Sequence, residues 1–179
     1  MSKTAAVAGA GIFGASLARR LARDGWDVTL YERHEPGHER AASGDESRLI
    51  RFAHGSDAWY TRSAWRARDL WRELEAESGA ELFRECGVAW FALAEDGWEA
   101  ESERVLREQG IPVERLPPED GAGLFPSFDA GDLAFILWEP SAGILRAADA
   151  TRAMTESARQ AGVKLVRKAA EPGRVEADV

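Results

Sequence analysis

The sequence is poor in the residue types on which several classes of protein depend. Its 179 residues include one cysteine and three histidines, and only three of its 23 Lys and Arg residues are lysines. A single cysteine, Cys86, excludes an internal disulfide and favours a reducing compartment, so we expect a cytoplasmic protein. Cys86 itself is expected to be a small core residue. The histidines lack the spacing of a metal site, so no metal is expected.

Positive charge and long apolar runs are also scarce. The formal net charge is -8 and the sequence pI is about 5.0, which disfavours a nucleic-acid partner, because phosphates require a basic face. No stretch approaches the roughly 18 to 20 apolar residues of a membrane span. The small apolar residues of 5–18 superficially resemble a signal peptide, but three glycines within them favour another interpretation. We therefore expect a soluble protein with neither nucleic acid nor membrane as partner.

The hydrophobic pattern alternates between short apolar runs and segments of helical period. A strand, a helix and a second strand open the chain, and a loop over His34–Ser47 follows them. The next helix carries a stripe of aromatic and apolar residues on one face. This stripe begins with Tyr60 and is expected in the core. The expected helices are Ile12–Arg23, Trp59–Ser78, Glu99–Gln109 and Ala147–Ala161. The expected strands are Thr4–Ala8, Asp27–Tyr31, Glu81–Glu85, Val88–Leu93, Pro112–Leu116, Leu133–Trp138 and Val163–Val166, with a loop at Pro117–Pro126.

This order predicts an α/β fold in which a Rossmann-like βαβ unit is interrupted by a largely antiparallel segment. We expect residues 1–80 to form the nucleotide-binding unit with its following helix. Residues 81–140 would belong to a substrate domain, and 141–179 would return to the first domain. The last expected strand has no closing element after it, so we expect the fold to be incomplete.

A glycine motif follows the first strand and opens the first helix. Gly9 lets the strand turn, Gly11 leaves room for a pyrophosphate, and Gly14 lets the helix pack on the sheet. Glu32 ends the second strand about 20 residues further on, where a carboxylate accepts hydrogen bonds from a ribose diol and repels a 2′-phosphate. The motif predicts a dinucleotide other than NADP, and it does not separate FAD from NAD.

The segment Ser43–Arg51 carries two arginines three residues apart, Arg48 and Arg51. If the segment is helical, both lie on one face. They could serve an anion site, or they could be solvated surface residues paired with Asp45 and Glu46.

Several motifs together resemble the FAD-dependent D-amino-acid-oxidase-like family, in the branch of monomeric sarcosine oxidase and N-methyltryptophan oxidase. They occur in the same order as in that family and span nearly the whole chain, and Ser43–Arg51 is the most specific of them. These motifs are Gly9–Gly14, Glu32-Arg33, Ser43–Arg51 with Ala53-His54-Gly55, Leu70–Leu74, Gly87-Val88, Glu139–Gly143 and the helix that ends at Ala161-Gly162.

The resemblance implies a function and a set of site residues. The implied reaction transfers a hydride from the carbon next to an amine nitrogen to flavin N5. An imine forms, and molecular oxygen reoxidises the flavin to give hydrogen peroxide. Arg51 would bind the carboxylate of a small amine or amino-acid substrate, and Arg48 and His54 would complete the catalytic set. FAD would be bound by Gly9, Gly11, Ile12, Phe13, Gly14, Glu32, Arg33, Ser43, Ser47 and Arg48.

The chain also departs from this branch. His54 stands where the branch has a tyrosine near the substrate, and family members are considerably longer. The alternative function is therefore a dinucleotide-binding module or inactive fragment without redox activity of its own. The possible partners include a complementing C-terminal chain or a second copy of this one. An NAD-dependent dehydrogenase is disfavoured by Ser43–Arg51.

Overall fold

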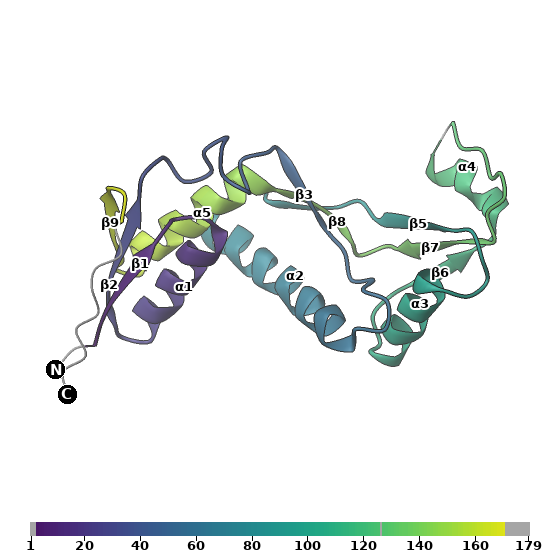
Figure 1. The fold of residues 1–179 in the computed structure, drawn as a ribbon, viewed down its shortest axis with the longest axis horizontal. Coiled ribbons are helices and arrows are strands. Elements are labelled where there is room, and N and C mark those ends of the chain that lie inside the picture. The colour runs from purple at the N-terminus through teal and green to yellow at the C-terminus, as the bar shows by residue number, and fades with distance from the viewer. Residues whose placement is uncertain (1–2, 126, 171–179) are drawn as a thin grey trace. The chain divides into compact units, whose positions relative to one another are not determined.

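The computed structural model describes residues 3–125 and 127–170, and the chain divides into two compact units (Figure 1). Unit 1 contains the described residues of 1–48, 74–82 and 146–179, and unit 2 contains those of 49–73 and 83–145. The expected first domain, 1–80, is thus divided between the units, because 49–73 belong to the second. Pro126, the expected end of a loop, lies outside the described residues, as do 171–179.

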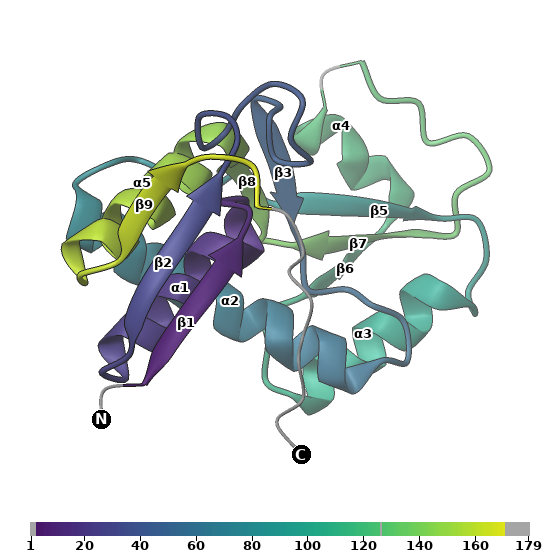
Figure 2. The ribbon, with the colours of Figure 1, turned by 60° about the vertical axis from the view of Figure 1, so that its left-hand side comes forward.

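Unit 1 is built on a parallel sheet. Its strands are β1 (Thr4–Ala8), β2 (Asp27–Glu32) and β9 (Lys164–Arg167) in the order β1-β2-β9. Helix α1 (Ile12–Arg23) connects β1 to β2, which gives the expected βαβ unit, and α5 (Ala147–Gln160) leads into β9. Figure 2 shows α1 and α5 together behind the sheet, and the two helices pack against one another.

The alternation of side chains along the strands determines which face of this sheet is buried. Val7 of β1 pairs with Leu30 of β2, and both are buried together with Val28. The helices contribute small buried residues to this core, such as Ala15 and Ala18 of α1. Small side chains allow a helix to approach a sheet closely, so the sequence of α1 suits its position.

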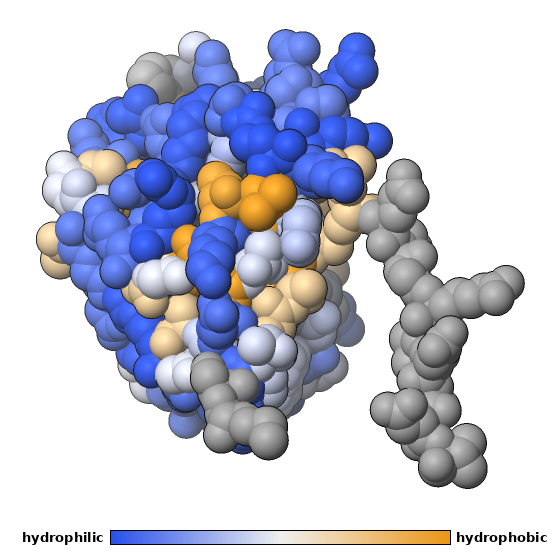
Figure 3. Space-filling model, turned by 90° about the vertical axis from the view of Figure 1, so that its left-hand side faces the viewer, coloured by the Kyte–Doolittle hydropathy of each residue, from blue (hydrophilic) through white to orange (hydrophobic). Residues whose placement is uncertain are grey.

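The opposite face of the sheet is open in the described structure. Ala6 and Ala8 of β1 are exposed, and Tyr31 of β2 is half-buried. With Ala169 and Ala170 they line part of a shallow cavity of about 610 Å³. Figure 3 looks onto the side of the molecule where β1, β2 and β9 lie and shows apolar side chains gathered among hydrophilic ones. Parallel sheets normally have both faces covered, so this face is a candidate for contact with further protein.

Unit 2 is largely antiparallel, as expected. Strand β7 (Phe135–Glu139) lies between β5 (Val88–Ala92) and β6 (Glu114–Leu116) and runs antiparallel to both. Helix α3 (Trp98–Glu108) contributes Leu106 to a core that also contains Phe52 and Leu137. A 3-10 turn (Pro118–Asp120) and the short α4 (Gly121–Leu124) follow β6.

A second sheet has the order β3-β8-β4 and contains two strands that the sequence did not predict as such. Strand β8 (Gly143–Arg146) pairs antiparallel with β4 (Phe83–Glu85). Strand β3 (Ser47–Ile50) occupies the segment for which a helix was considered. Arg48 is therefore in a strand and Arg51 follows it, so the condition that would place both on one helical face is not met.

Two expectations about burial were wrong. Cys86 is exposed, because it lies in the connection between β4 and β5 and not within a strand. Helix α2 (Ala58–Ser78) buries Leu74, but Tyr60 near its start is 56% exposed. Among the helices of the described residues, none is both long and apolar enough to cross a membrane.

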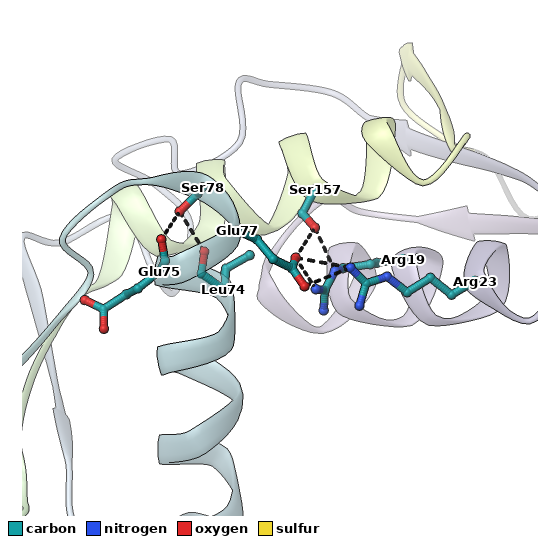
Figure 4. Close-up of polar contacts among 7 residues, drawn as sticks. All are labelled: Arg19, Arg23, Leu74, Glu75, Glu77, Ser78 and Ser157. Atoms are coloured by element: carbon teal, nitrogen blue, oxygen red, sulfur yellow. Dashed lines mark hydrogen bonds and ion pairs between the residues drawn. The ribbon is translucent and has the colours of Figure 1, made fainter.

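A polar cluster joins the last turn of α2 to α1 and α5 within unit 1 (Figure 4). The carboxylate of Glu77 accepts hydrogen bonds from Arg19 at 2.5 Å, from Arg23 at 3.0 Å and from the Ser157 hydroxyl at 3.1 Å. Partial burial acts to raise the pKa of Glu77, but the two arginines and Ser157 outweigh it, so the pKa is lowered. The ionised form is favoured in the folded protein.

This cluster predicts a pH-dependent contribution to stability. Because the pKa of Glu77 is lowered on folding, its stabilisation is present above the ordinary glutamate pKa and is lost as the pH falls through the lowered value. We expect Glu77→Gln to lower the melting temperature by a few degrees at neutral pH, since such a network contributes about 1 kcal/mol. The difference from the parent should shrink in acid. Melting curves of both proteins at a series of pH values measure this.

Glu73→Gln is the matched control, because Glu73 pairs with Arg66 at 3.4 Å while both side chains are exposed. It should leave the melting temperature nearly unchanged. A Glu77→Gln deficit of the same size at every pH would contradict the assigned ionisation.

Candidate functional site

The glycine loop between β1 and α1 depends on two positions that only glycine can fill. Gly9 has φ +92°, a left-handed conformation, and its N–H donates to the Tyr31 carbonyl at 2.7 Å. A Cβ added at Gly14 would lie 1.9 Å from the carbonyl oxygen of Gly9. Helix α1 can therefore approach the end of β1 only because Gly14 has no side chain.

Gly11 serves a different purpose, because no atom lies within 4 Å of a Cβ built there. It is the N-cap of α1 and has no side chain to cap the helix. The first N–H groups of a helix lack partners within the helix and carry partial positive charge, which suits a phosphate. Ile12 is half-buried and Phe13 is 90% exposed at this same end. The open space beside Gly11 fits the close approach of a pyrophosphate.

Glu32 lies at the end of β2, next to this loop. Its Oε2 accepts a hydrogen bond from the Ala10 N–H at 2.7 Å, and its Oε1 accepts one from the His34 N–H at 2.8 Å. Burial acts to raise the pKa of Glu32, but the backbone donors of His34 and Ala10 outweigh it, so the pKa is lowered. Each carboxylate oxygen has a second lone pair, so Glu32 retains the capacity to accept hydrogen bonds from a diol.

A cavity of about 430 Å³ opens beside Glu32 within unit 1. Ala10 and Gly11 line it on the side of the glycine loop, and Arg33 and Arg40 bring positive charge. His34 and His38, which also line it, stack with ring centroids 4.5 Å apart. Its volume lies within the range of small-ligand pockets. The glycine loop, the carboxylate and this cavity together fit the adenosine and pyrophosphate portion of a dinucleotide.

Arg48, Ser43 and Ser47 follow in the same unit. Arg48 pairs with Asp45 at 2.6 Å and donates to the carbonyl oxygens of Ala42 and Ser47. The pairing of Arg48 with Asp45 is half of the solvated arrangement considered from the sequence. Ser47 is exposed and Ser43 is half-buried.

Arg51 and His54 lie in unit 2 and are close together, with Nη1 of Arg51 3.4 Å from Nδ1 of His54. The half-buried guanidinium of Arg51 lies over two indole rings, 5.2 Å from the centroid of Trp90 and 5.9 Å from that of Trp98. It also donates to the Ala53 carbonyl. Among the described residues, no carboxylate forms an ion pair with Arg51.

His54 is the titratable neighbour of Arg51. Burial is the largest cause that lowers its pKa, and the positive charge of Arg51 lowers it further. The imidazole is therefore neutral over a wider pH range than a free histidine. Its ring also lies 5.6 Å from that of Tyr60, measured between centroids.

Sequence analysis assigned no role to Glu139, the last residue of β7. The side chain is fully buried, and it accepts hydrogen bonds from Trp90 and from the backbone N–H groups of Phe52 and Ala53. The sequence offered two signals, an acidic residue directly after an apolar run and its place in the Glu139–Gly143 motif. These signals mark an unusual residue but do not identify its partners.

A protein family described as FAD dependent oxidoreductase matches residues 4–175 of the chain. The monomeric sarcosine oxidase of Bacillus sp. (strain B-0618) is 29% identical over 161 residues, which are 89% of this chain and 41% of that protein. The N-methyl-L-tryptophan oxidase of Yersinia pestis (strain Pestoides F) is 27% identical over 156 residues, 87% of this chain and 42% of that protein. The chain thus spans about two fifths of the length of these curated relatives.

Solved structures show the same fold. L-proline dehydrogenase from P.horikoshii has a TM-score of 0.80 at 24% identity, over 92% of this chain and 43% of that one. Glycine oxidase from Bacillus cereus ATCC 14579 has a TM-score of 0.65 at 21% identity, over 92% of this chain and 46% of that one. These likenesses establish a Rossmann-like α/β fold.

Replacing Gly11 or Gly14 by valine should have opposite effects on stability and on FAD binding. Gly11→Val should keep the fold within about 1 kcal/mol, since a side chain there meets open space and valine is only a poor N-cap. It should nevertheless abolish FAD binding, because the side chain fills the space for the pyrophosphate. Gly14→Val should destabilise the protein by about 1–3 kcal/mol or more, because the clash is with backbone.

Thermal melting and fluorescence titration with FAD measure the two effects separately. Tight FAD binding by a folded Gly11→Val protein would contradict the pyrophosphate site.

Proposed function

Because the chain belongs to the family of FAD-dependent oxidoreductases, we propose that it forms the FAD-binding part and a portion of the substrate site of an enzyme that oxidises a secondary amine or an amino acid. FAD is the cofactor of this family. When bound, it supplies the acceptor for the hydride that leaves the carbon next to the substrate nitrogen. Molecular oxygen is the proposed final oxidant.

The proposed cofactor residues are those of the glycine loop and the adjacent cavity. The helix N-terminus after Gly11 would neutralise the pyrophosphate, with Ile12, Phe13 and Gly14 supplying its first N–H groups. Glu32 would accept the ribose hydroxyls, and Arg33 would line the adenosine cavity. From the family resemblance, Ser43 and Arg48 would lie along the flavin, where Arg48 would favour negative charge on the reduced ring, and Ser47 would also bind the cofactor.

The observation that carries the substrate proposal is the environment of Arg51. The half-buried Arg51 lies over two indoles and has no ion-pair partner among the described residues. Its planar set of donors matches a carboxylate in bidentate fashion. We therefore assign Arg51 to the carboxylate of the substrate. The neutral His54 beside it would contact the substrate without adding a second positive charge.

The Arg51 assignment predicts a selective loss of affinity. The substrate is the N-methyl amino acid on which the parent enzyme has the highest kcat/KM. Arg51→Ala should lower this kcat/KM by roughly 30- to 1,000-fold, the cost of losing a charged contact of about 2–4 kcal/mol. The decarboxylated amine should be affected far less. Arg51→Lys should recover part of the loss, because one ammonium cannot reproduce a bidentate contact. Steady-state kinetics of the flavin-loaded enzyme on both compounds measure this.

Arg115→Ala is the matched control. Arg115 also lies over an aromatic ring, that of Phe135 at 3.4 Å, but it is paired with Glu95 and Glu103. It should leave the ratio of kcat/KM between acid and amine unchanged. If Arg51→Ala lowers kcat/KM by the same factor on both compounds, Arg51 does not bind the carboxylate.

A further inference from the structure

The buried carboxylate of Glu139 has three hydrogen-bond donors, all of them neutral. Oε2 accepts from the backbone N–H of Phe52 at 2.7 Å and from that of Ala53 at 2.9 Å. Oε1 accepts from the indole N–H of Trp90 at 2.7 Å. The side chain is 0% exposed, so water cannot take the place of these donors.

The strand register explains why Trp90 can reach this carboxylate. Glu139 of β7 is paired with Val88 of β5, and Trp90 follows two residues later on the same face of the sheet. The two side chains are therefore diagonal neighbours, within reach of a long side chain and an indole.

The three N–H donors require a hydrogen-bond acceptor at both oxygens of the Glu139 side chain. Burial raises the pKa of Glu139, and Trp90, the two backbone donors and the charge of Arg51 offset this only in part. The NH2 group of a glutamine, in either orientation, would face at least one of these N–H groups. A glutamine therefore cannot accept all three bonds.

Each of these bonds fixes part of the environment of Arg51. The N–H of Phe52 belongs to the peptide that joins it to Arg51, and the next peptide supplies the Ala53 N–H. The carbonyl oxygen of Ala53 in turn accepts a hydrogen bond from the Arg51 guanidinium. The ring of Trp90 lies 5.2 Å below that guanidinium. Glu139 thus holds both the backbone that carries Arg51 and the ring on which it lies.

Glu139 does this without occupying the donors of Arg51. No hydrogen bond joins the two side chains in the part of the chain that the structure describes, and the acceptor sites of Glu139 are directed to neutral N–H groups. Apart from Nη1, which contacts Ala53 and His54, the guanidinium keeps its donors for another anion.

We propose that Glu139 is a positioning residue that orients Arg51 to bind the carboxylate of the substrate. The inference rests on the proposed role of Arg51. It differs from a purely structural role because it predicts a loss confined to substrates that carry a carboxylate.

The test uses the flavin-loaded enzyme with an N-methyl amino acid and its decarboxylated amine. Glu139→Gln should raise KM for the acid about 10- to 100-fold, the cost of a small misplacement of a binding group. KM for the amine and kcat on the amine should change little. Trp90→Phe removes one donor and keeps a ring beneath Arg51, so it should produce a smaller shift in the same direction.

Glu103→Gln is the control for loss of a carboxylate in the same unit. Glu103 is mostly buried and accepts bonds from Arg107 and Arg115, so its loss should leave the ratio of the two KM values unchanged. If Glu139→Gln does not fold, the test rests on Trp90→Phe. An unchanged ratio of the KM values for acid and amine in that variant overturns the proposal.

The outcomes separate this inference from the function on which it rests. If Arg51→Ala discriminates between acid and amine but Glu139→Gln raises both KM values equally, Glu139 is structural only and the proposed function stands. If Arg51→Ala does not discriminate, both the carboxylate role of Arg51 and the positioning role of Glu139 are wrong.

Discussion

A Cβ at Gly14 would lie 1.9 Å from the carbonyl oxygen of Gly9. Helix α1 can therefore begin where it does only because residue 14 is glycine. That close approach places the N-terminus of α1 at the end of β1, next to the end of β2. Glu32 then reaches back to the Ala10 N–H at 2.7 Å, and the open space beside Gly11 faces the same region. The arrangement of the cofactor cavity thus follows from a steric constraint between two backbone segments.

In unit 2 the buried carboxyl group of Glu139 takes the corresponding role. Leaving a carboxylate without partners in an apolar interior is costly, so Glu139 requires the three N–H groups that surround it. Those donors come from the segment after Arg51 and from Trp90, and they therefore fix the surroundings of the guanidinium. The two proposed sites differ in kind. One is shaped by the absence of side chains, and the other by a buried carboxyl group whose hydrogen bonds must all be satisfied.

The sequence was sufficient where a local pattern determined the structure. The apolar run before Gly9 and the helical period after it predicted β1 and α1 with the observed bounds, because a buried strand and an amphipathic helix leave different periods. Strand β8 was not predicted, since four residues that begin with Gly143 show no alternation to read. Strand β3 was missed because Ser47 and Arg48 are polar and exposed. The contacts of Glu139 could not be predicted at all, because Trp90 comes near it through the pairing of β5 with β7, and Phe52 and Ala53 are distant from it in the sequence.

The most direct test of the central claim is to identify the small molecule that the protein carries. The protein should be purified from cells that express its whole coding region, and then denatured so that the released compounds can be analysed by mass spectrometry. If the glycine loop and Glu32 bind FAD, FAD should be recovered in close to equimolar amount, or should remain attached to the polypeptide as a flavin adduct. Recovery of a nicotinamide dinucleotide in place of any flavin would contradict the account.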